Sequence, residues 1–136
     1  MHVDINIKVS SDKAKIPQYK TYGSSGMDIS SVEECVLKPG EVKAIHTGLS
    51  LNLPPGMEIQ IRPRSGLALK NKITVLNTPG TVDEDYTGEL MAILINHGAE
   101  DFKIEVGDRI AQIVLCQVDR AIFHVVDELK QTERGA

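Results

Sequence analysis

The sequence contains few aromatic side chains: among its 136 residues there is no tryptophan, and there are only three tyrosines and two phenylalanines. Hydrophobic residues still make up 41% of the chain, and they are largely Ile, Val and Leu, which favour β-strands. No hydrophobic run approaches the length of a membrane span, and no apolar signal sequence follows Met1. We therefore expect a β-rich protein that has no membrane partner.

Positive charge is also not in excess, since the formal net charge is −4 at pH 7. Direct nucleic-acid binding is not expected, because a protein that binds a duplex needs a basic face that releases counterions. Cys35 and Cys116 fit no metal-site spacing and make no disulfide framework, so we expect reduced thiols in a cytoplasmic protein. The histidines also share no ligand-like spacing and are interpreted as structural or surface residues: His2, His46, His97 and His124.

Short apolar stretches alternate with Pro/Gly turn signals at roughly every ten residues, a pattern typical of an all-β sandwich or barrel. Residues 1–9 alternate between apolar and polar side chains, which predicts a half-buried strand. Residues 90–95 are apolar at every position, which predicts a strand buried on both faces, in a barrel or between subunits. We expect one domain over residues 1–126, followed by a charged tail over residues 127–136.

A change of pattern after Arg64 predicts one short α-helix at about residues 65–71. Ser65 is a candidate N-cap, and Lys70 and Lys72 stand where a helix C-terminus favours cations. Unpaired N–H groups at the helix start, together with the Ser65 hydroxyl and the Arg64 guanidinium, suit a phosphate. The alternative is a capped surface helix with a solvated arginine.

Residues 77–88 lie between two apolar runs and form a candidate site. They include two glycines, a proline, three acids and Tyr86, which predicts a short rigid loop and not a helix. The alternative is a polar hairpin whose acids only keep it soluble. A similar choice stays open for two other residues: Asp28 either caps a turn or belongs to a site, and Gln112 is either a structural hydrogen-bonding residue or a ligand contact.

Four separated segments resemble the motifs of the trimeric deoxyuridine triphosphate nucleotidohydrolases, the dUTPases. They are residues 26–29 (Gly-Met-Asp-Ile), 63–68 (Pro-Arg-Ser-Gly-Leu-Ala), 77–88 and 107–112 (Gly-Asp-Arg-Ile-Ala-Gln). Each segment alone is a weak signal, but all four occur in the family's order, and the turns and strands around them are also similar. The resemblance therefore covers nearly the whole chain.

The resemblance implies a jelly-roll-like distorted β-barrel with one short helix, assembled as a homotrimer whose sites take residues from more than one subunit. It also implies a glycine-rich C-terminal arm with an aromatic residue that covers the bound base. Thr132, Arg134 and Gly135 resemble the start of this arm, whereas its aromatic residue and later glycines do not occur within the 136 residues. Arg134 is implied as a further phosphate contact.

The implied activity is hydrolysis of dUTP to dUMP and pyrophosphate, with Mg²⁺ bound across the triphosphate and a water attacking the α-phosphorus. This reaction limits uracil in DNA and supplies dUMP for thymidylate synthesis. Asp83 is the implied catalytic residue, because a carboxylate accepts hydrogen bonds and can orient that water. Tyr86 would pack on the deoxyribose and exclude a 2′-hydroxyl, and Asn77 would read the uracil edge.

The resemblance assigns the phosphates to Arg64, Ser65 and Gln112. It assigns the waters around Mg²⁺ to Asp28, because this ion keeps much of its hydration shell. The other residues implied to contact the nucleotide are Gly66, Gly80, Val82 and Met91.

Two rival functions are weighed against this interpretation. A dCTP deaminase shares the fold, but residues 82–86 (Val-Asp-Glu-Asp-Tyr) follow the dUTPase form. A nucleotide-binding module without turnover is possible because a fold does not fix a function. Asp83 argues against such a module, which would gain nothing from a carboxylate that orients water.

Overall fold

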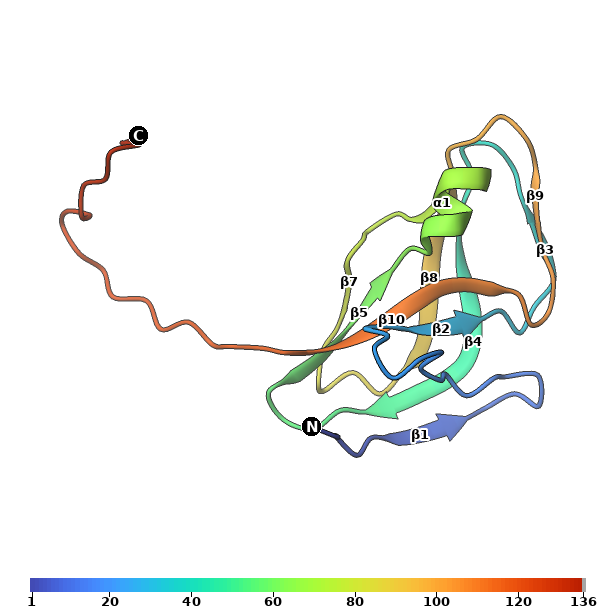
Figure 1. Ribbon diagram of the computed structural model, residues 1–136, viewed down its shortest axis with the longest axis horizontal. Coiled ribbons are helices and arrows are strands. Elements are labelled where there is room, and N and C mark those ends of the chain that lie inside the picture. Colours follow the sequence, from blue (N-terminus) through green and yellow to red (C-terminus); the bar gives the residue numbers. More distant parts are fainter. Residues whose placement is uncertain (136) are drawn as a thin grey trace.

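The computed structural model describes residues 1–135 and confirms an all-β fold with one short helix (Figure 1). The elements in chain order are β1 (Asn6–Val9), β2 (Met27–Ser30), β3 (Cys35–Leu37), β4 (Val42–Asn52), β5 (Met57–Arg62), α1 (Ser65–Asn71), β6 (Ile73–Val75), β7 (Gly80–Val82), β8 (Glu89–Asn96), β9 (Phe102–Ile104) and β10 (Arg109–Gln117). No helix in residues 1–135 is both long and apolar enough to cross a membrane.

The strands form three antiparallel sheets, ordered β1-β4-β8-β6, β2-β10-β5-β7 and β3-β9. The two four-stranded sheets share one apolar core, to which β4 and β8 contribute Leu49 and Leu94, and β5 and β10 contribute Ile59 and Ile113. Within residues 1–135 the strand pairings do not close these sheets into a barrel.

Strand β8 alternates between buried and accessible residues, so the prediction that residues 90–95 are buried on both faces is wrong for the single chain. Leu90, Ala92 and Leu94 are buried, whereas Ile93 is 36% exposed and Met91 is half-buried. The reason is that β8 lies between β4 and β6 and packs only one face on the core. Its second apolar face is left uncovered within the chain.

The helix occupies the predicted residues, but the prediction of its N-cap is wrong. The cap residue is Arg64, whose backbone is extended (φ −91°, ψ 130°), and no side chain caps the helix there. Ser65 is already helical, so its hydroxyl is not in the position that bonds the free N–H groups of the first turn. At the other end Lys72 takes a left-handed conformation (φ 62°), and its Nζ donates a hydrogen bond to the Leu69 carbonyl at 2.8 Å.

The two ends of the chain differ from the sequence prediction in extent. Strand β1 covers only Asn6–Val9 of the predicted residues 1–9, although Val3 and Ile5 before it are half-buried. After β10 the chain runs away from the body as an extended segment (Figure 1), and residues 118–135 are exposed. The division into a domain over residues 1–126 and a tail stays a prediction, and residue 136 lies outside the described residues.

We predict that Asn96 is a large contributor to stability, because its fully buried side chain holds three backbone groups. Its Nδ2 donates to the carbonyls of Leu37 (2.9 Å) and Glu100 (2.8 Å), and its Oδ1 accepts from the Gly98 N–H (2.8 Å). Asn96→Leu would leave those groups unpaired and lower the free energy of unfolding by about 3 kcal/mol. Urea denaturation at one protein concentration measures this, and Asn52→Leu at an exposed position of β4 is the control. Equal stability of the two variants would contradict the prediction.

Candidate active site

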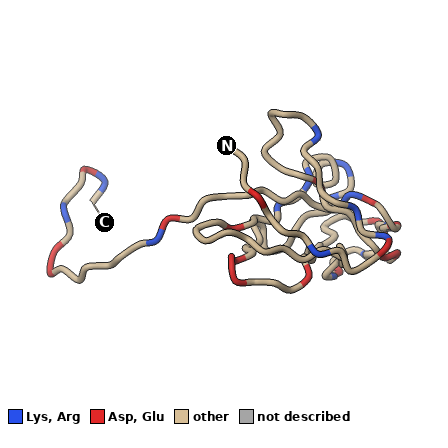
Figure 2. The backbone as a smooth tube through the Cα atoms, turned by 90° about the horizontal axis from the view of Figure 1, so that it is seen from below, with Lys and Arg blue, Asp and Glu red and all other residues tan. Residues whose placement is uncertain are grey.

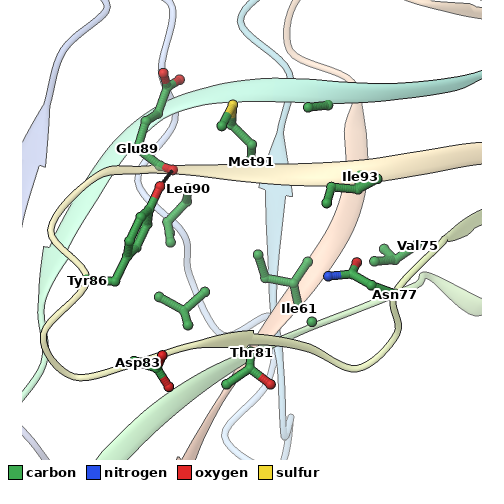
Figure 3. A pocket seen from close by; sticks show the side chains of 13 residues that line it. Ile61, Val75, Asn77, Thr81, Asp83, Tyr86, Glu89, Leu90, Met91 and Ile93 are labelled. Carbon is green, nitrogen blue, oxygen red and sulfur yellow. Dashed lines mark hydrogen bonds between the residues drawn. The ribbon is translucent and has the colours of Figure 1, made fainter.

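A cavity of about 270 Å³ gathers six of the residues that the sequence assigned to the nucleotide. These six residues are Asn77, Gly80, Val82, Asp83, Tyr86 and Met91. Figure 3 shows that the cavity lies between the segment that carries β7 and the strand β8, with Ile61 of β5 at its floor. Part of the segment formed by residues 77–88 therefore lines a cavity.

Strand β7 gives this wall its shape. It pairs with β5 in the register Gly80 to Ile61 and Val82 to Ile59, so Pro79-Gly80 leads into a strand where a turn was predicted. A Cβ atom on Gly80 would lie 3.3 Å from the Asn77 Nδ2 and 3.5 Å from the Ile61 Cβ. A side chain at this position would therefore crowd the Asn77 amide.

Asp83 follows the last residue of β7 directly and begins a turn that ends at Tyr86. The Tyr86 N–H donates to the Asp83 carbonyl at 3.1 Å, which places the carboxylate and the ring at the same end of the cavity. Of the three consecutive acids, Asp83 alone lines this cavity; Glu84 and Asp85 line a neighbouring one of about 380 Å³. Glu84 also pairs with Arg120 at 3.6 Å.

Tyr86 is 40% exposed, and a hydrogen bond holds its ring at the hydroxyl end. Its hydroxyl donates to the Glu89 carbonyl at 2.8 Å (Figure 3). A Cβ atom on Gly88 would lie only 2.6 Å from that hydroxyl oxygen, so the glycine leaves room for the ring. In Figure 3 the Tyr86 ring and the Asn77 amide lie on opposite sides of Ile61.

A second group of predicted residues lies where β2, β10 and the start of α1 meet. The Asp28 carboxylate pairs with the Arg64 Nε at 3.3 Å and with the Arg109 Nη1 at 3.5 Å. Gln112 lies opposite Asp28 in the β2–β10 pairing, and its Nε2 donates to the Pro63 carbonyl at 3.0 Å. Gln112 is thus a structural hydrogen-bonding residue in this chain, and a phosphate contact from it stays a prediction.

Local packing explains the glycine that precedes this strand. A Cβ atom on Gly26 would overlap the Gln112 Oε1, so the first and fourth motif-like segments are in direct contact. Ser65 and Gly66 are exposed at the start of α1. None of Asp28, Arg64 and Gln112 lines the 270 Å³ cavity of the same chain. Arg134 lies in the segment that leaves the body (Figure 1).

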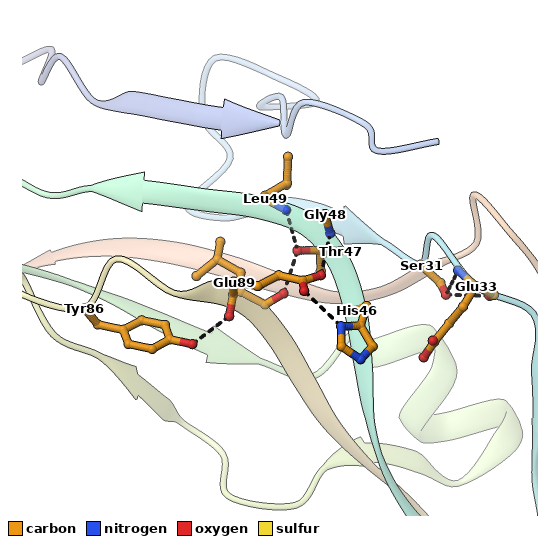
Figure 4. Close-up of polar contacts among 9 residues, drawn as sticks. Ser31, Glu33, His46, Thr47, Gly48, Leu49, Tyr86 and Glu89 are labelled. Carbon is orange, nitrogen blue, oxygen red and sulfur yellow. Dashed lines mark hydrogen bonds and ion pairs between the residues drawn. The ribbon is translucent and has the colours of Figure 1, made fainter. Parts of the chain in front are cut away.

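Sequence reasoning missed two features of the site. Arg109 was quoted within a motif but given no role, and it is the second cation on Asp28. The other feature is the pair of His46 and Glu89, whose Nδ1 and Oε1 lie 2.9 Å apart (Figure 4). Forty-three positions separate these two residues, so only the β4–β8 register brings them together and no local motif could reveal it.

The His46–Glu89 pair shifts the pKa of both partners. The hydrogen bond that His46 donates to Glu89 raises the pKa of His46 above its ordinary 6.5, against a smaller opposing effect of burial. Burial pushes the pKa of Glu89 upward, but the hydrogen bonds from His46 and from the Gly48 N–H together outweigh it and lower this pKa below 4.5. Both shifts favour the charged pair near neutral pH.

We predict that the stabilisation supplied by this pair decreases as the pH rises into the alkaline range. Because the pKa of His46 is raised by folding, its contribution is fully present below pH 6.5 and is lost as the pH rises through the raised value. The melting temperatures of the wild type and of His46→Asn should therefore converge as the pH increases. Thermal denaturation at several pH values measures this, and a constant difference across the range would contradict it.

The described residues hold no ready-made metal cage. Within residues 1–135 no group of three His, Cys, Asp or Glu side chains is arranged to bind a metal ion. Cys35 and Cys116 are free thiols, as predicted. A divalent cation at this site would therefore take most of its ligands from a bound molecule and from water, with a protein carboxylate such as Asp28 in an outer position.

Comparison with known proteins identifies a family and several relatives that resemble this chain. Residues 12–136 match the dUTPase family. A deoxyuridine 5′-triphosphate nucleotidohydrolase of Treponema denticola is 61% identical over 125 residues, which cover 90% of this chain and 87% of the relative. One from Alkaliphilus metalliredigens is 54% identical over 132 residues, covering 97% of this chain and 92% of the relative.

Solved structures agree with the fold. A mutant of the dUTPase of phage 80alpha superposes with a TM-score of 0.90 at 25% identity, covering 99% of this chain and 96% of that one. A mutant dUTPase of the S. aureus phage phi11, described with a structural Mg(II) ion, gives a TM-score of 0.85 at 23% identity over 93% of this chain and 98% of that one.

Proposed function

Because the chain belongs to the dUTPase family, we propose that it hydrolyses dUTP to dUMP and pyrophosphate as a dUTP diphosphatase. The observation that carries this proposal is the cavity that brings Asn77, Asp83 and Tyr86 together. An amide, a carboxylate and an aromatic ring are the groups needed to read a base, orient a water and cover a sugar.

The size of the cavity suits the nucleoside part of the substrate. Its volume of about 270 Å³ is at the lower end for small-molecule sites, so it would enclose the base and the sugar and leave the triphosphate outside. Asn77 offers both a donor and an acceptor to the uracil edge. Cytosine would reverse the pattern and leave buried polar groups unpaired, which is a strong source of discrimination.

Asp83 is the proposed catalytic residue. As an exposed carboxylate at the edge of the cavity, it can accept a hydrogen bond from a water and draw its proton as the oxygen attacks the α-phosphorus. It can also accept a hydrogen bond from the 3′-hydroxyl of the sugar. Gly80, Val82 and Met91 would contact the nucleotide as parts of the same wall.

The triphosphate would be held by the second group of residues. Arg64 offers a guanidinium, Ser65 a hydroxyl and Gln112 an amide, all suited to phosphate oxygens. Gly66 lies beside them at the exposed start of α1, and Arg134 would add a further contact from the tail. Because this group does not line the cavity of its own chain, we place the complete site between two or more subunits.

A homotrimer is the proposed assembly. One face of β8 is apolar but uncovered, with Ile93 36% exposed. The extended tail carries apolar side chains that are largely exposed in the single chain, since Phe123 is 91% and Ile122 82% exposed. Charged residues of both signs follow them along the tail (Figure 2). Surfaces of this kind are normally buried between subunits.

Mg²⁺ is the proposed cofactor, and the residues present fit it in an outer position. The Asp28 oxygens are accessible enough to accept hydrogen bonds from coordinated waters, since this side chain is 32% exposed. Bound across the triphosphate, the ion would neutralise the charge of the leaving pyrophosphate. Arg64 and Arg109 on either side of Asp28 keep this carboxylate oriented.

In the cell the proposed activity limits the uracil available to DNA and supplies dUMP for thymidylate synthesis. We place the protein in the cytoplasm, an assignment supported by its two free thiols. Its partners would be dUTP and further copies of itself.

Pyrophosphate release from dUTP, dCTP, dTTP and UTP tests this function. We expect release from dUTP alone, in the presence of Mg²⁺ and not of a chelator. Ammonia released from dCTP would instead identify a deaminase, and saturable dUTP binding without pyrophosphate release would identify a binding module.

A further inference from the structure

The Tyr86 ring depends on one backbone carbonyl for its position. Its hydroxyl donates to the Glu89 carbonyl at 2.8 Å, and this is the single hydrogen bond of the Tyr86 side chain within residues 1–135. Tyr86 is 40% exposed and lies outside the core cluster, so this hydrogen bond is a main restraint on the ring. Whatever holds the Glu89 backbone in place therefore also holds the ring.

The Glu89 side chain ties that backbone to the neighbouring strand (Figure 4). Its Oε1 lies 2.9 Å from the His46 Nδ1, and its Oε2 accepts a hydrogen bond from the Gly48 N–H at 2.9 Å. One carboxylate thus bridges a side chain and a backbone group of β4. Both bonds are charge-assisted, which makes them stronger than bonds between neutral groups.

This bridge lies where the ladder between the two strands is irregular. The β4–β8 register shifts between His46 and Ser50, and Gly48 within the shift has a φ of +69°. The buried Thr47 hydroxyl, which donates to the Leu90 carbonyl at 2.6 Å, also joins the two strands here. The Glu89 carboxylate therefore supplies bonds that a regular ladder would have supplied through the backbone.

We propose that Glu89 is a positioning residue for sugar discrimination: by bridging His46 and Gly48 it fixes its own carbonyl, which in turn holds the Tyr86 ring against the deoxyribose. The proposal rests on the proposed function and extends it to a residue that does not contact the reacting atoms. Glu33 is a further charged group near His46, and its carbonyl and N–H are bonded to the Ser31 hydroxyl.

Substitutions at Glu89 test the proposal through the ratio of kcat/KM for dUTP to that for UTP. Glu89→Ala should lower this ratio about tenfold, the effect of losing one or two charge-assisted hydrogen bonds. Glu89→Gln can still accept from Gly48 and donate to neutral His46, so it should retain most of the ratio. Glu34→Ala, which breaks the 3.2 Å ion pair with Lys103 on another sheet, is the matched control and should leave the ratio unchanged.

A double-mutant cycle separates positioning from a loss of stability. Tyr86→Phe removes the hydroxyl through which Glu89 is proposed to act, so adding Glu89→Ala to it should lower the ratio little further. Full additivity of the two substitutions, or an unchanged ratio in Glu89→Ala, would overturn the proposal.

A second measurement does not need turnover. The chain has no tryptophan, so in a Tyr19→Phe, Tyr22→Phe background Tyr86 is the sole strong emitter. Acrylamide should quench this emission more in Glu89→Ala than in the parent, because the ring is released. Equal quenching would overturn the proposal, even if the wild type hydrolysed dUTP. Conversely, absence of dUTP hydrolysis in the wild type would refute the proposed function and leave this readout of Tyr86 position intact.

Discussion

Replacing Asp83 by asparagine is expected to lower kcat for dUTP by about 100- to 10,000-fold, the usual contribution of a general base. The amide has nearly the shape of the carboxylate and still offers one acceptor oxygen, but it cannot take up a proton from the attacking water. Affinity for a non-hydrolysable imido analogue of dUTP should change little, because the wall of the cavity is unaltered. Steady-state kinetics and calorimetric titration measure the two quantities.

The neighbouring acids supply the control for this prediction. Asp85 is exposed two positions further along the same segment but does not line the 270 Å³ cavity that holds Asn77 and Tyr86. Asp85→Asn changes the net charge equally and should leave kcat close to that of the wild type. If both variants retained normal turnover, Asp83 would have no catalytic role.

The second large effect is expected from Tyr86→Ala, which should admit UTP as a substrate. The ring lines the cavity, beside the space proposed for the sugar, where it is proposed to exclude a 2′-hydroxyl. Its removal should lower the discrimination between dUTP and UTP by up to about 100-fold. This is the discrimination that steric exclusion can provide against one added hydroxyl. The ratio of the two kcat/KM values measures the change.

A different tyrosine provides the comparison. Tyr22 is fully exposed on a loop that is far from residues 77–88 in the sequence, and Tyr22→Ala should keep the discrimination of the wild type. Continued strict rejection of UTP by Tyr86→Ala would show that another group senses the 2′ position, and it would also remove the basis for the role of Glu89.

The parts of the site that sequence reasoning predicted are those that local chemistry determines. Helix α1 was located because its helix formers and its terminal lysines lie within one short segment. The residues from Asn77 to Tyr86 were grouped because they are close in sequence, and six of them line one cavity: Asn77, Gly80, Thr81, Val82, Asp83 and Tyr86. Residues that are close in the sequence were therefore sufficient to predict both the helix and this part of the cavity.

Features that depend on strand register were not predictable. The two faces of residues 90–95 are equally apolar in the sequence, and only the position of β8 between β4 and β6 decides which face meets the core. The His46–Glu89 bond likewise needs the register of β4 and β8. The contact of Gly26 with Gln112 joins residues on different strands. The N-cap of α1 was predicted wrongly for a smaller reason, because the helix begins one residue earlier than a cap at Ser65 requires.

Hydrolysis of dUTP in ¹⁸O-labelled water, by the wild type and by Asp83→Asn, tests the account most directly. If Asp83 directs a water to the α-phosphorus, the wild type will place the label in dUMP and none in pyrophosphate, and Asp83→Asn will form labelled dUMP at least about 100-fold more slowly. Label in pyrophosphate, or labelled dUMP formed at the wild-type rate by Asp83→Asn, would contradict it.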